Sequence, residues 1–578
     1  MISFFKNHSF NILSFIFFLS LNAFIYRSLI LNLSTNLLDW NDYPLFVWIM
    51  QHNIDNFQQL AFQNFFNTNI FYPFQGNLLF SDLFLPTSVV GYLVQIFVKS
   101  PVAIFNTVFF LVLAINPIAC FFFWKNFFSS KWTVFFATLT TAFSPFVVLN
   151  SYHFQMLNIW SLFFCLGFLL RKELSFRSAI FGGVFLAIQF LSGIYYAIFA
   201  LFIITVWYVI KSCEIKKSKI KLLNLLRRLF VFTLTFLILA GFFIIKYLQV
   251  KNAYNITRDY WEYVIYASHP TDYIFSQFQS LLAETGFWKR WNSFSNHGSS
   301  ASFPGFVLLI FSLIGIFNYQ VVNKIKSISL KLTNISIFFL ILLICGFVFS
   351  LGPRLSVNGV YLAIPLPYSI VLKLAPPLFE PIRADSRWAF LVFFSLTYFS
   401  CIGIQKIAKS IKKEIIVVLA LSLFYMIEII PISRNTESKQ FYNPVYDTLQ
   451  NQCSASKQVV LEYPLTQDKK DADIVTNLSY KTQMLLASLT HKCNIVNGYS
   501  GYTPKDYESY ETELYTIVPV GGKDRFYQLL KERNVNLFKL NKKEIYSNKA
   551  ESIEEWLQDS KRYVILIENE TYVIAKLL

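Results

Sequence analysis

The sequence of 578 residues has a mean hydropathy of +0.47, 55% hydrophobic residues and a formal net charge of +17. So much apolar surface exceeds what a water-soluble core can bury, which excludes an ordinary soluble protein and indicates a polytopic membrane protein. The Lys and Arg residues fall largely in short clusters between apolar segments, a pattern that signals membrane topology rather than nucleic-acid binding.

The first apolar run, residues 9–27, follows Lys6. It lacks a convincing small-x-small cleavage site, so we expect an uncleaved first helix with a cytoplasmic N-terminus. The loop after it, residues 28–101, contains four aspartates and has no Lys or Arg before residue 99. Because basic residues are retained on the cytoplasmic side of membrane proteins, such a loop is typical of the extracytoplasmic side.

Ten further apolar runs are long enough to cross a bilayer, allowing for tilt and ragged ends. They lie at residues 102–124, 132–150, 155–170, 177–191, 194–211, 229–247, 303–320, 333–351, 387–405 and 414–431. Together with the first run, they predict about eleven transmembrane helices.

One more apolar run, residues 83–98, decides the orientation of everything after it. If this run lies flat on the outer surface, the basic residues gather in the inner loops, and the short outer turns 151–155 and 191–196 carry none. The inner loops are then 125–131, 171–177, 211–228, 324–331 and 406–413. Only this arrangement satisfies the positive-inside rule at every short loop.

Two larger outer loops complete the predicted membrane domain of residues 1–434. They are residues 248–302, rich in aromatic and polar residues, and residues 352–386, whose six prolines disfavour long helices. The predicted domain is all-α and polytopic.

The composition changes in residues 435–578. Two apolar β-type runs, 459–465 and 563–568, predict buried strands, and the segments 523–534 and 551–560 have helical character. We therefore expect a small C-terminal α/β domain, which lies outside the cytoplasm because it follows an odd number of spans.

Polar and ionisable residues converge on the predicted outer face, whereas the apolar runs contain almost none. A transporter normally carries such groups near the bilayer midplane, so this distribution favours an enzyme that acts at one interface. The candidates are Asp42, Asp82, His153, Gln155, Tyr195, Tyr196, His297, Arg354, Arg383, Asp385 and Arg387.

The two candidate catalytic acids each have a structural alternative. Asp42 opens the amphipathic stretch DYPLFVWIM, where a carboxylate beside apolar surface suits a general base, but Asp before a proline-containing first turn is also an ordinary helix N-cap. Asp82 precedes an apolar run and has the same alternative.

Arginine and the remaining candidates also have two interpretations. Arg383 and Arg387 share a face if their helix has already begun, and a guanidinium pair suits a lipid-linked phosphate; the alternative is interfacial anchoring or an ion pair with Glu380 or Asp385. The loop histidines are otherwise hydrogen-bonded or exposed residues, and the two tyrosines otherwise belong to an aromatic belt.

A family resemblance rests on the order of these features and on short motifs along residues 35–505. The motifs are NDYPLFVW, YPFQG, FSPF, LSGIYY, FPG, PRLSVNG, IPLPY, IRADSRW and VNGYSGYTP. The chain resembles the GT-C class of membrane glycosyltransferases, and most closely a bacterial branch of GT-C-like integral membrane proteins. The resemblance implies a sugar donor on a polyprenyl phosphate and chemistry on the extracytoplasmic side of the plasma (inner) membrane.

The resemblance also implies roles for individual residues. The family's first acid falls on Asp42, with Asn41 in place of the usual Gly, and its second acid, often Glu, falls on Asp82. The arginines of the last outer loop fall on Arg383 and Arg387. No contiguous DxD is present, so no metal and no other cofactor is carried over.

The implied reaction is an inverting displacement in which Asp42 deprotonates an acceptor hydroxyl while the arginines hold the departing polyprenyl phosphate. The acceptor is an envelope glycan, a lipid or a protein. Two other functions stay open: a lipid-linked sugar transporter or flippase, and a non-catalytic envelope-assembly protein.

Cys453 and Cys493 are the two cysteines of the expected outer domain. Each precedes a segment of possible strand, so the two could lie within bonding reach, and an extracytoplasmic location permits a disulfide. The alternative is two buried free thiols, because the sequence does not give the Cα separation.

Overall fold

The computed structural model describes residues 2–215, 219–275, 280, 285, 301–317, 334–357, 359–408, 410–431, 436–438 and 445–578. The chain forms two compact units. Unit 1 comprises Met1–Ile30, Phe109–Phe242 and Thr257–Arg434, and unit 2 comprises Leu31–Val108, Phe243–Ile256 and Asn435–Leu578. Residues of the predicted first outer loop thus share a unit with the C-terminal segment.

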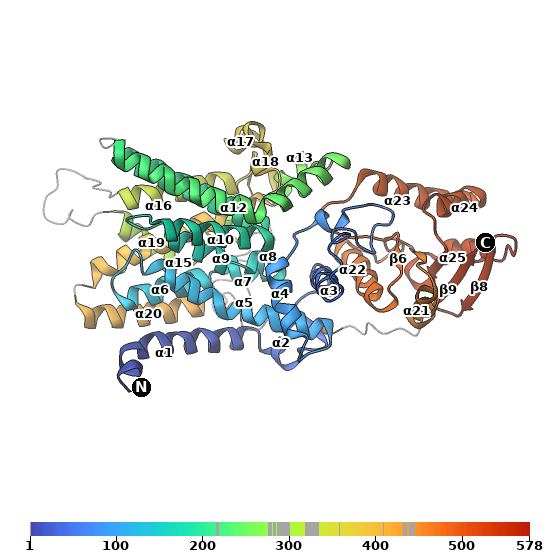
Figure 1. The fold of residues 1–578 in the computed structure, drawn as a ribbon, viewed down its shortest axis with the longest axis horizontal. Helices are drawn as coiled ribbons and strands as arrows, with labels where there is room; N and C mark the ends of the chain where they lie inside the picture. Colours follow the sequence, from blue (N-terminus) through green and yellow to red (C-terminus); the bar gives the residue numbers. More distant parts are fainter. Residues whose placement is uncertain are drawn as a thin grey trace. The chain divides into compact units, whose positions relative to one another are not determined.

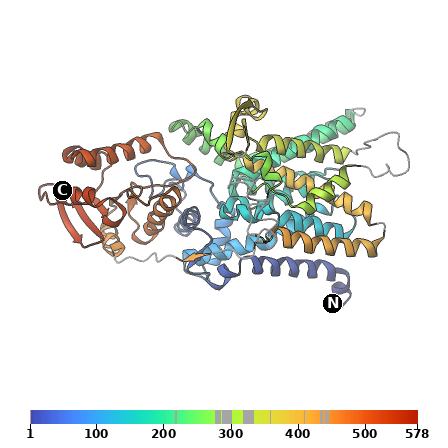
Figure 2. The ribbon, with the colours of Figure 1, turned by 180° about the vertical axis from the view of Figure 1, so that it is seen from behind.

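Unit 1 is built mainly from helices that run alongside one another (Figures 1 and 2). Its longer helices are α1 (Ile2–Ile25), α6 (Lys131–Ala142), α9 (Trp160–Leu169), α10 (Phe176–Ser192), α11 (Ile194–Ile215), α15 (Phe306–Ile316), α16 (Asn334–Ser350), α19 (Ala389–Ile407) and α20 (Ile411–Ile429). α5 (Pro101–Trp124) and α12 (Lys219–Ala253) are divided between the two units, and α2 (Arg27–Leu31) lies at the boundary.

Shorter elements connect these helices. They are α7 (Pro145–Leu149), η2 (Asn150–Tyr152), α8 (Phe154–Leu157), α13 (Tyr260–Ile265), η3 (Pro270–Tyr273), the antiparallel hairpin β2 (Arg354–Val357) and β3 (Val360–Pro365), α17 (Tyr368–Leu374), α18 (Pro376–Phe379) and η5 (Asp385–Trp388). In the proline-rich segment 352–386, the described residues thus form a hairpin and short helices.

Five helical stretches of the described residues are long and apolar enough to cross a membrane, and six apolar helices of 10–17 residues accompany them. The long stretches are Pro101–Trp124, Lys131–Tyr152, Ile194–Ile215, Lys219–Ala253 and Asp385–Ile407. The chain is therefore a membrane protein, and the count of eleven spans stays a prediction.

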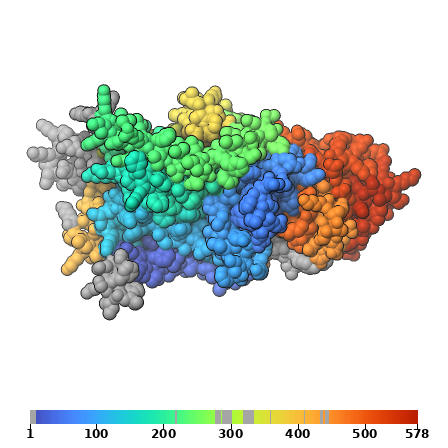
Figure 3. All heavy atoms as spheres, in the orientation of Figure 1, coloured from blue at the N-terminus to red at the C-terminus, as the bar shows by residue number. Residues whose placement is uncertain are grey.

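Helix α19 forms the core of unit 1. It packs against α15, α16 and α6, and most of its residues are buried. Gly315 of α15 permits the closest approach, since a Cβ there would lie 1.9 Å from the carbonyl oxygen of Phe399. In contrast, only 11% of the most apolar stretch of α12 is buried, and this helix lies on the surface of the unit (Figure 3).

Unit 2 contains a five-stranded sheet in the order β6-β5-β7-β9-β8, in which β6, β5 and β7 are parallel and β9 and β8 are antiparallel to their neighbours. Its strands are β5 (Val459–Tyr463), β6 (Asn494–Ile495), β7 (Leu537–Asn541), β8 (Tyr563–Glu568) and β9 (Tyr572–Leu577). β5 and β8 confirm the positions of the two predicted strands; β5 is buried throughout, whereas the prediction of burial is wrong for most of β8, which lies at the edge of the sheet.

The helices that accompany the sheet are α21 (Val445–Ala455), α22 (Ile474–His491), α23 (Lys505–Ile517), η6 (Val518–Val520), α24 (Lys523–Glu532), η7 (Lys542–Glu544) and α25 (Ser547–Leu557). α24 and α25 fall on the two segments that the sequence marks as helical.

The first loop supplies the rest of unit 2, namely β1 (Asn36–Leu37), α3 (Tyr43–Gln59), η1 (Asn77–Phe80) and α4 (Leu85–Val94). With ten residues, α4 spans about 15 Å, which is too short to cross a bilayer. This length agrees with the prediction that the run 83–98 does not span the membrane.

The first loop and the C-terminal segment are joined by backbone hydrogen bonds as well as by packing. β1 pairs with β4 (Glu437–Ser438), and α3 packs against α22. The amide of Phe71 donates to the carbonyl of Asn497, and the amide of Tyr72 donates to that of Ile495. Segments that share hydrogen bonds and a buried core must lie on the same side of any membrane.

A disulfide joins Cys453 of α21 to Cys493, directly before β6, with the Cα atoms 5.3 Å apart. This confirms the bridged alternative.

The sheet also contains a buried ion pair between Glu462 of β5 and Lys539 of β7, 2.5 Å apart. Burial alone would lower the pKa of Lys539, but the charge of Glu462, together with Tyr446 and the hydrogen bonds to both residues, raises this pKa.

Candidate functional site

Asp42 lies at the start of α3, where Pro44 occupies the first turn, but its side chain does not cap the helix. The carboxylate instead accepts a hydrogen bond of 2.7 Å from the hydroxyl of Tyr499. The Asp39 carboxylate accepts from the backbone amides of Asn41 and Asp42 and fixes the turn. The structure thus contradicts the side-chain cap, and the Asp42 side chain is half-buried.

Asp82 follows η1 in a turn that Tyr247 and Tyr502 approach. Tyr247 donates a hydrogen bond of 2.8 Å to the carbonyl of Ser81, and it interacts electrostatically with both Asp82 and Tyr502. The N-cap position of α4 is Phe84 rather than Asp82, so the simple capping alternative is wrong for this residue too.

Both candidate acids, Asp42 and Asp82, belong to unit 2 and lie near the loop of residues 497–504, which contains the NGYSGYTP motif. Tyr499 reaches Asp42, and Gly501 packs against the backbone of residues 80 and 81, with its Cβ position 3.0 Å from the carbonyl oxygen of Phe80. The sequence identified this motif only as part of a resemblance. No local sequence pattern predicts the contact between Asp42 and Tyr499, which are 457 positions apart.

Arg387 of η5 is the most unusual charge of unit 1. It is only 8% exposed, and its guanidinium stacks on the ring of Tyr195 at 4.4 Å. Among the described residues, nothing forms an ion pair or a hydrogen bond with this guanidinium, so the predicted alternative of a pair with Asp385 is wrong. Because a buried cation normally has an anionic partner, Arg387 is suited to an external anion.

Arg383 lies before η5, so it does not share a helical face with Arg387. It stacks on Tyr266 at 4.9 Å, and its Nε lies 3.7 Å from the carboxylate of Glu262. Its side chain is 38% exposed, so this ion pair is well solvated.

Arg354 of β2 has a different, aromatic environment. Its guanidinium lies 5.6 Å from the ring centre of Tyr260 and 5.7 Å from that of Trp261. Both rings belong to α13 and are exposed, which gives unit 1 a surface of arginines backed by aromatic rings.

The remaining candidates divide between packing and surface positions. The Tyr196 hydroxyl donates to the carbonyl of Met156 at 2.8 Å and is fully buried, so Tyr196 holds α11 against α8. Gln155 packs against Gly193, whose Cβ would lie 3.0 Å from that of Gln155. His153 is a half-buried residue at the start of α8. The predicted substrate residue His297 lies outside the described residues.

Asp385 is fully buried two residues before Arg387. Its carboxyl group interacts with the hydroxyl of Tyr368, which accepts a hydrogen bond of 3.2 Å from the indole of Trp388. Within the described residues, no group of three or more His, Cys, Asp or Glu side chains could hold a metal ion. That the protein uses no metal stays a prediction.

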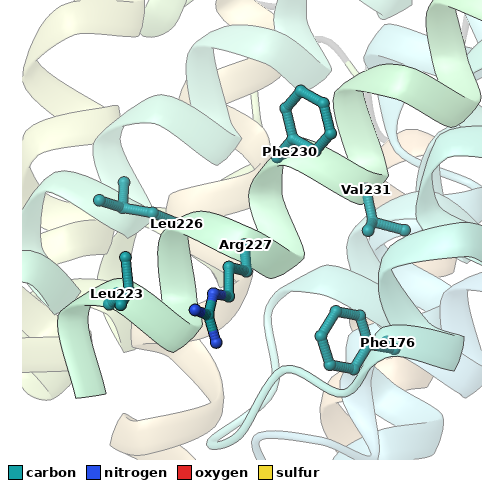
Figure 4. A pocket seen from close by; sticks show the side chains of 6 residues that line it. All are labelled: Phe176, Leu223, Leu226, Arg227, Phe230 and Val231. Carbon is teal, nitrogen blue, oxygen red and sulfur yellow. The ribbon is translucent and has the colours of Figure 1, made fainter. Parts of the chain in front are cut away.

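A shallow hollow of about 470 Å³ lies between α10 and α12 of unit 1 (Figure 4). It is lined by Phe176, Leu223, Leu226, Arg227, Phe230 and Val231. The lining is almost wholly apolar and includes none of the candidate residues, so this hollow offers no chemistry for the proposed reaction.

The sequence also matches a described protein family. The family described as "Domain of unknown function (DUF6311)" matches residues 55–426, which is more than half of the sequence. The chain belongs to the DUF6311 family. No characterised protein matches this DUF6311 chain in sequence.

Solved structures show what the DUF6311 protein resembles in fold. The arabinofuranosyltransferase AftD from Mycobacteria matches 99% of the chain with a TM-score of 0.57 at 10% identity, and a mutant of AftD matches 98% with a TM-score of 0.54. A looser match, with a TM-score of 0.42, is the archaeal oligosaccharyltransferase AglB from Archaeoglobus fulgidus in complex with an inhibitory peptide and a dolichol-phosphate.

The DUF6311 chain spans about two fifths of the AftD chain that it matches. At this identity the similarity shows the fold alone, and at that level it confirms the GT-C-like resemblance drawn from the sequence.

Proposed function

We propose that this DUF6311 protein is a membrane glycosyltransferase. It transfers a sugar from a polyprenyl-phosphate-linked donor to a glycan, lipid or protein acceptor on the extracytoplasmic face of the membrane. The observation that carries the proposal is Arg387, a buried guanidinium without an anionic partner among the described residues, in a fold similar to that of a known glycosyltransferase.

The donor phosphate is the anion that Arg387 would bind. A guanidinium offers a planar fork of donors that matches two phosphate oxygens, and the ring of Tyr195 holds its plane in place. Arg383, with its partner Glu262, is the more solvated of the two arginines and would contribute long-range attraction rather than a tight contact.

Asp42 supplies the base in this proposal. Its carboxylate takes the proton of the acceptor hydroxyl, whose oxygen then attacks the anomeric carbon while the bond from that carbon to the phosphate oxygen breaks. Polyprenyl phosphate leaves with both bonding electrons, and the single displacement inverts the anomeric configuration. Positive charge stabilises a leaving group that is already an anion, so the step does not require a metal.

Transfer of labelled sugar by the purified protein in lipid nanodiscs tests the proposal. We expect product with the wild type, and a loss of at least about 100-fold in kcat with Asp42→Asn, which keeps the shape of the side chain but not its basicity. Movement of the lipid-linked sugar across a vesicle membrane without any transfer would refute the enzyme and favour the transporter.

A further inference from the structure

The C-terminal segment contributes one side chain that contacts the proposed base directly. Tyr499 belongs to the loop after β6, and its hydroxyl donates to Oδ1 of Asp42 at 2.7 Å, a short distance that is typical of a hydrogen bond to a charged acceptor.

The loop that presents Tyr499 is itself held on both sides. Asn497, which is buried, accepts from the amide of Glu462 at 2.8 Å and donates to its carbonyl at 2.7 Å. The next residue, Gly498, has no room for a side chain, because a Cβ there would lie 2.3 Å from the ring of Phe71. Its amide donates to the hydroxyl of Tyr507 at 3.2 Å.

These contacts fix the backbone immediately before Tyr499. Asn497 and Tyr507 attach it to the sheet and to α23, while Phe71 belongs to the first loop, the segment that also contains Asp42. The backbone on both sides of the Tyr499 hydrogen bond is therefore fixed, so the hydroxyl can determine where the Asp42 carboxylate points.

We propose that Tyr499 is a positioning residue for the transfer reaction. Its hydroxyl binds Oδ1 and so orients the Asp42 carboxylate for proton abstraction from the acceptor hydroxyl. This inference rests on the proposed function, and it gives the C-terminal segment a part in the chemistry. It also explains why the first loop and the last 140 or so residues of the chain pack as one unit.

Tyr499→Phe removes only the hydroxyl. We expect kcat to fall about tenfold or more with little change in the KM for the donor, since a hydrogen bond to a charged group is lost at the reacting carboxylate and not in donor binding. Tyr515→Phe is the matched control, because it also removes the hydroxyl of a half-buried tyrosine of unit 2, one that donates to the carbonyl of Thr466 at 2.7 Å.

A residue that acts only through Asp42 must lose its effect when Asp42 is absent. We therefore expect Tyr499→Phe to lower kcat no further in the Asp42→Asn background, whereas Tyr515→Phe should leave kcat near the wild-type value. An equal fall in both backgrounds, or wild-type kcat in Tyr499→Phe, would overturn the positioning role.

The thermal unfolding of the same four variants separates failure of this inference from failure of the proposed function. Non-additive midpoints for Asp42→Asn and Tyr499→Phe are expected from the hydrogen bond, and additive midpoints overturn the inference even if no activity is found. If the two substitutions are non-additive in stability but the wild type transfers no sugar, the proposed function is refuted instead.

Discussion

Replacement of Arg387 by Met is expected to leave the unliganded protein as stable as the wild type or to stabilise it. Burial of an unpaired cation costs several kcal/mol, and the one compensation in the described structure is its stacking on Tyr195 at 4.4 Å, which is worth up to about 2 kcal/mol. Methionine fills a similar volume without that cost. If Arg387 instead served to stabilise the fold, its replacement by Met would lower the stability of the protein.

The same substitution should weaken the binding of a polyprenyl phosphate strongly. Loss of a bidentate, charge-assisted contact costs roughly 1.5–3 kcal/mol, which corresponds to an increase in Kd of about 10- to 100-fold. Arg387→Lys should be only partly effective, because lysine keeps the charge and loses the fork.

Binding is measured by native mass spectrometry or by ligand-induced thermal shifts in detergent, with Arg383→Met as the control. Arg383 is 38% exposed and has an ion-pair partner at 3.7 Å, so its removal should change stability by less than about 1 kcal/mol and weaken binding less. A clearly destabilised Arg387→Met protein that still binds the lipid with wild-type affinity would refute the reasoning.

Two further predictions concern topology and the disulfide. Single cysteines are placed at Gln63, Glu555 or Lys172 in a variant that lacks the exposed Cys213. In intact cells, an impermeant thiol reagent should label the cysteines at positions 63 and 555 but not the one at position 172. Labelling at position 172 alone would show that the orientation in the membrane is the reverse of the predicted one. Replacement of Cys453 and Cys493 by Ser should lower the free energy of unfolding by up to about 4 kcal/mol for a sequence separation of 40, and alkylation of both cysteines in unreduced protein would contradict the bridge.

The sequence predicted the elements whose signals are local. Apolar runs indicate the helices of unit 1, and the apolar β-type runs after residue 434 locate β5 and β8. Each of these depends on residues within one helix or strand, so a single segment contains the whole signal.

Contacts between distant segments could not be predicted in this way. The position of Asp42 before Pro44 is compatible with a helix cap and with a base. In the structure its carboxylate accepts a hydrogen bond from Tyr499, a residue 457 positions away in the sequence. Arg383 and Arg387 would share a face on a continuous helix, but the helix starts only at Asp385. The disulfide likewise needed the 5.3 Å separation between the Cα atoms, which depends on the packing of α21 beside β6.

The pairing of the first loop with the C-terminal segment also sets an order of assembly during synthesis. Residues 31–108 leave the ribosome early, but β6 and the loop with Tyr499 follow some 400 residues later, a delay on the order of 20–80 s at ordinary translation rates. Throughout that interval Phe71 and Tyr72 lack their hydrogen-bond partners, and Asp42 lacks Tyr499. A chain whose synthesis stops within the membrane helices would therefore contain the first loop without the contacts that order it. Asp42 and Asp82 would reach their final arrangement only after the C-terminal segment has been delivered to the same side of the membrane.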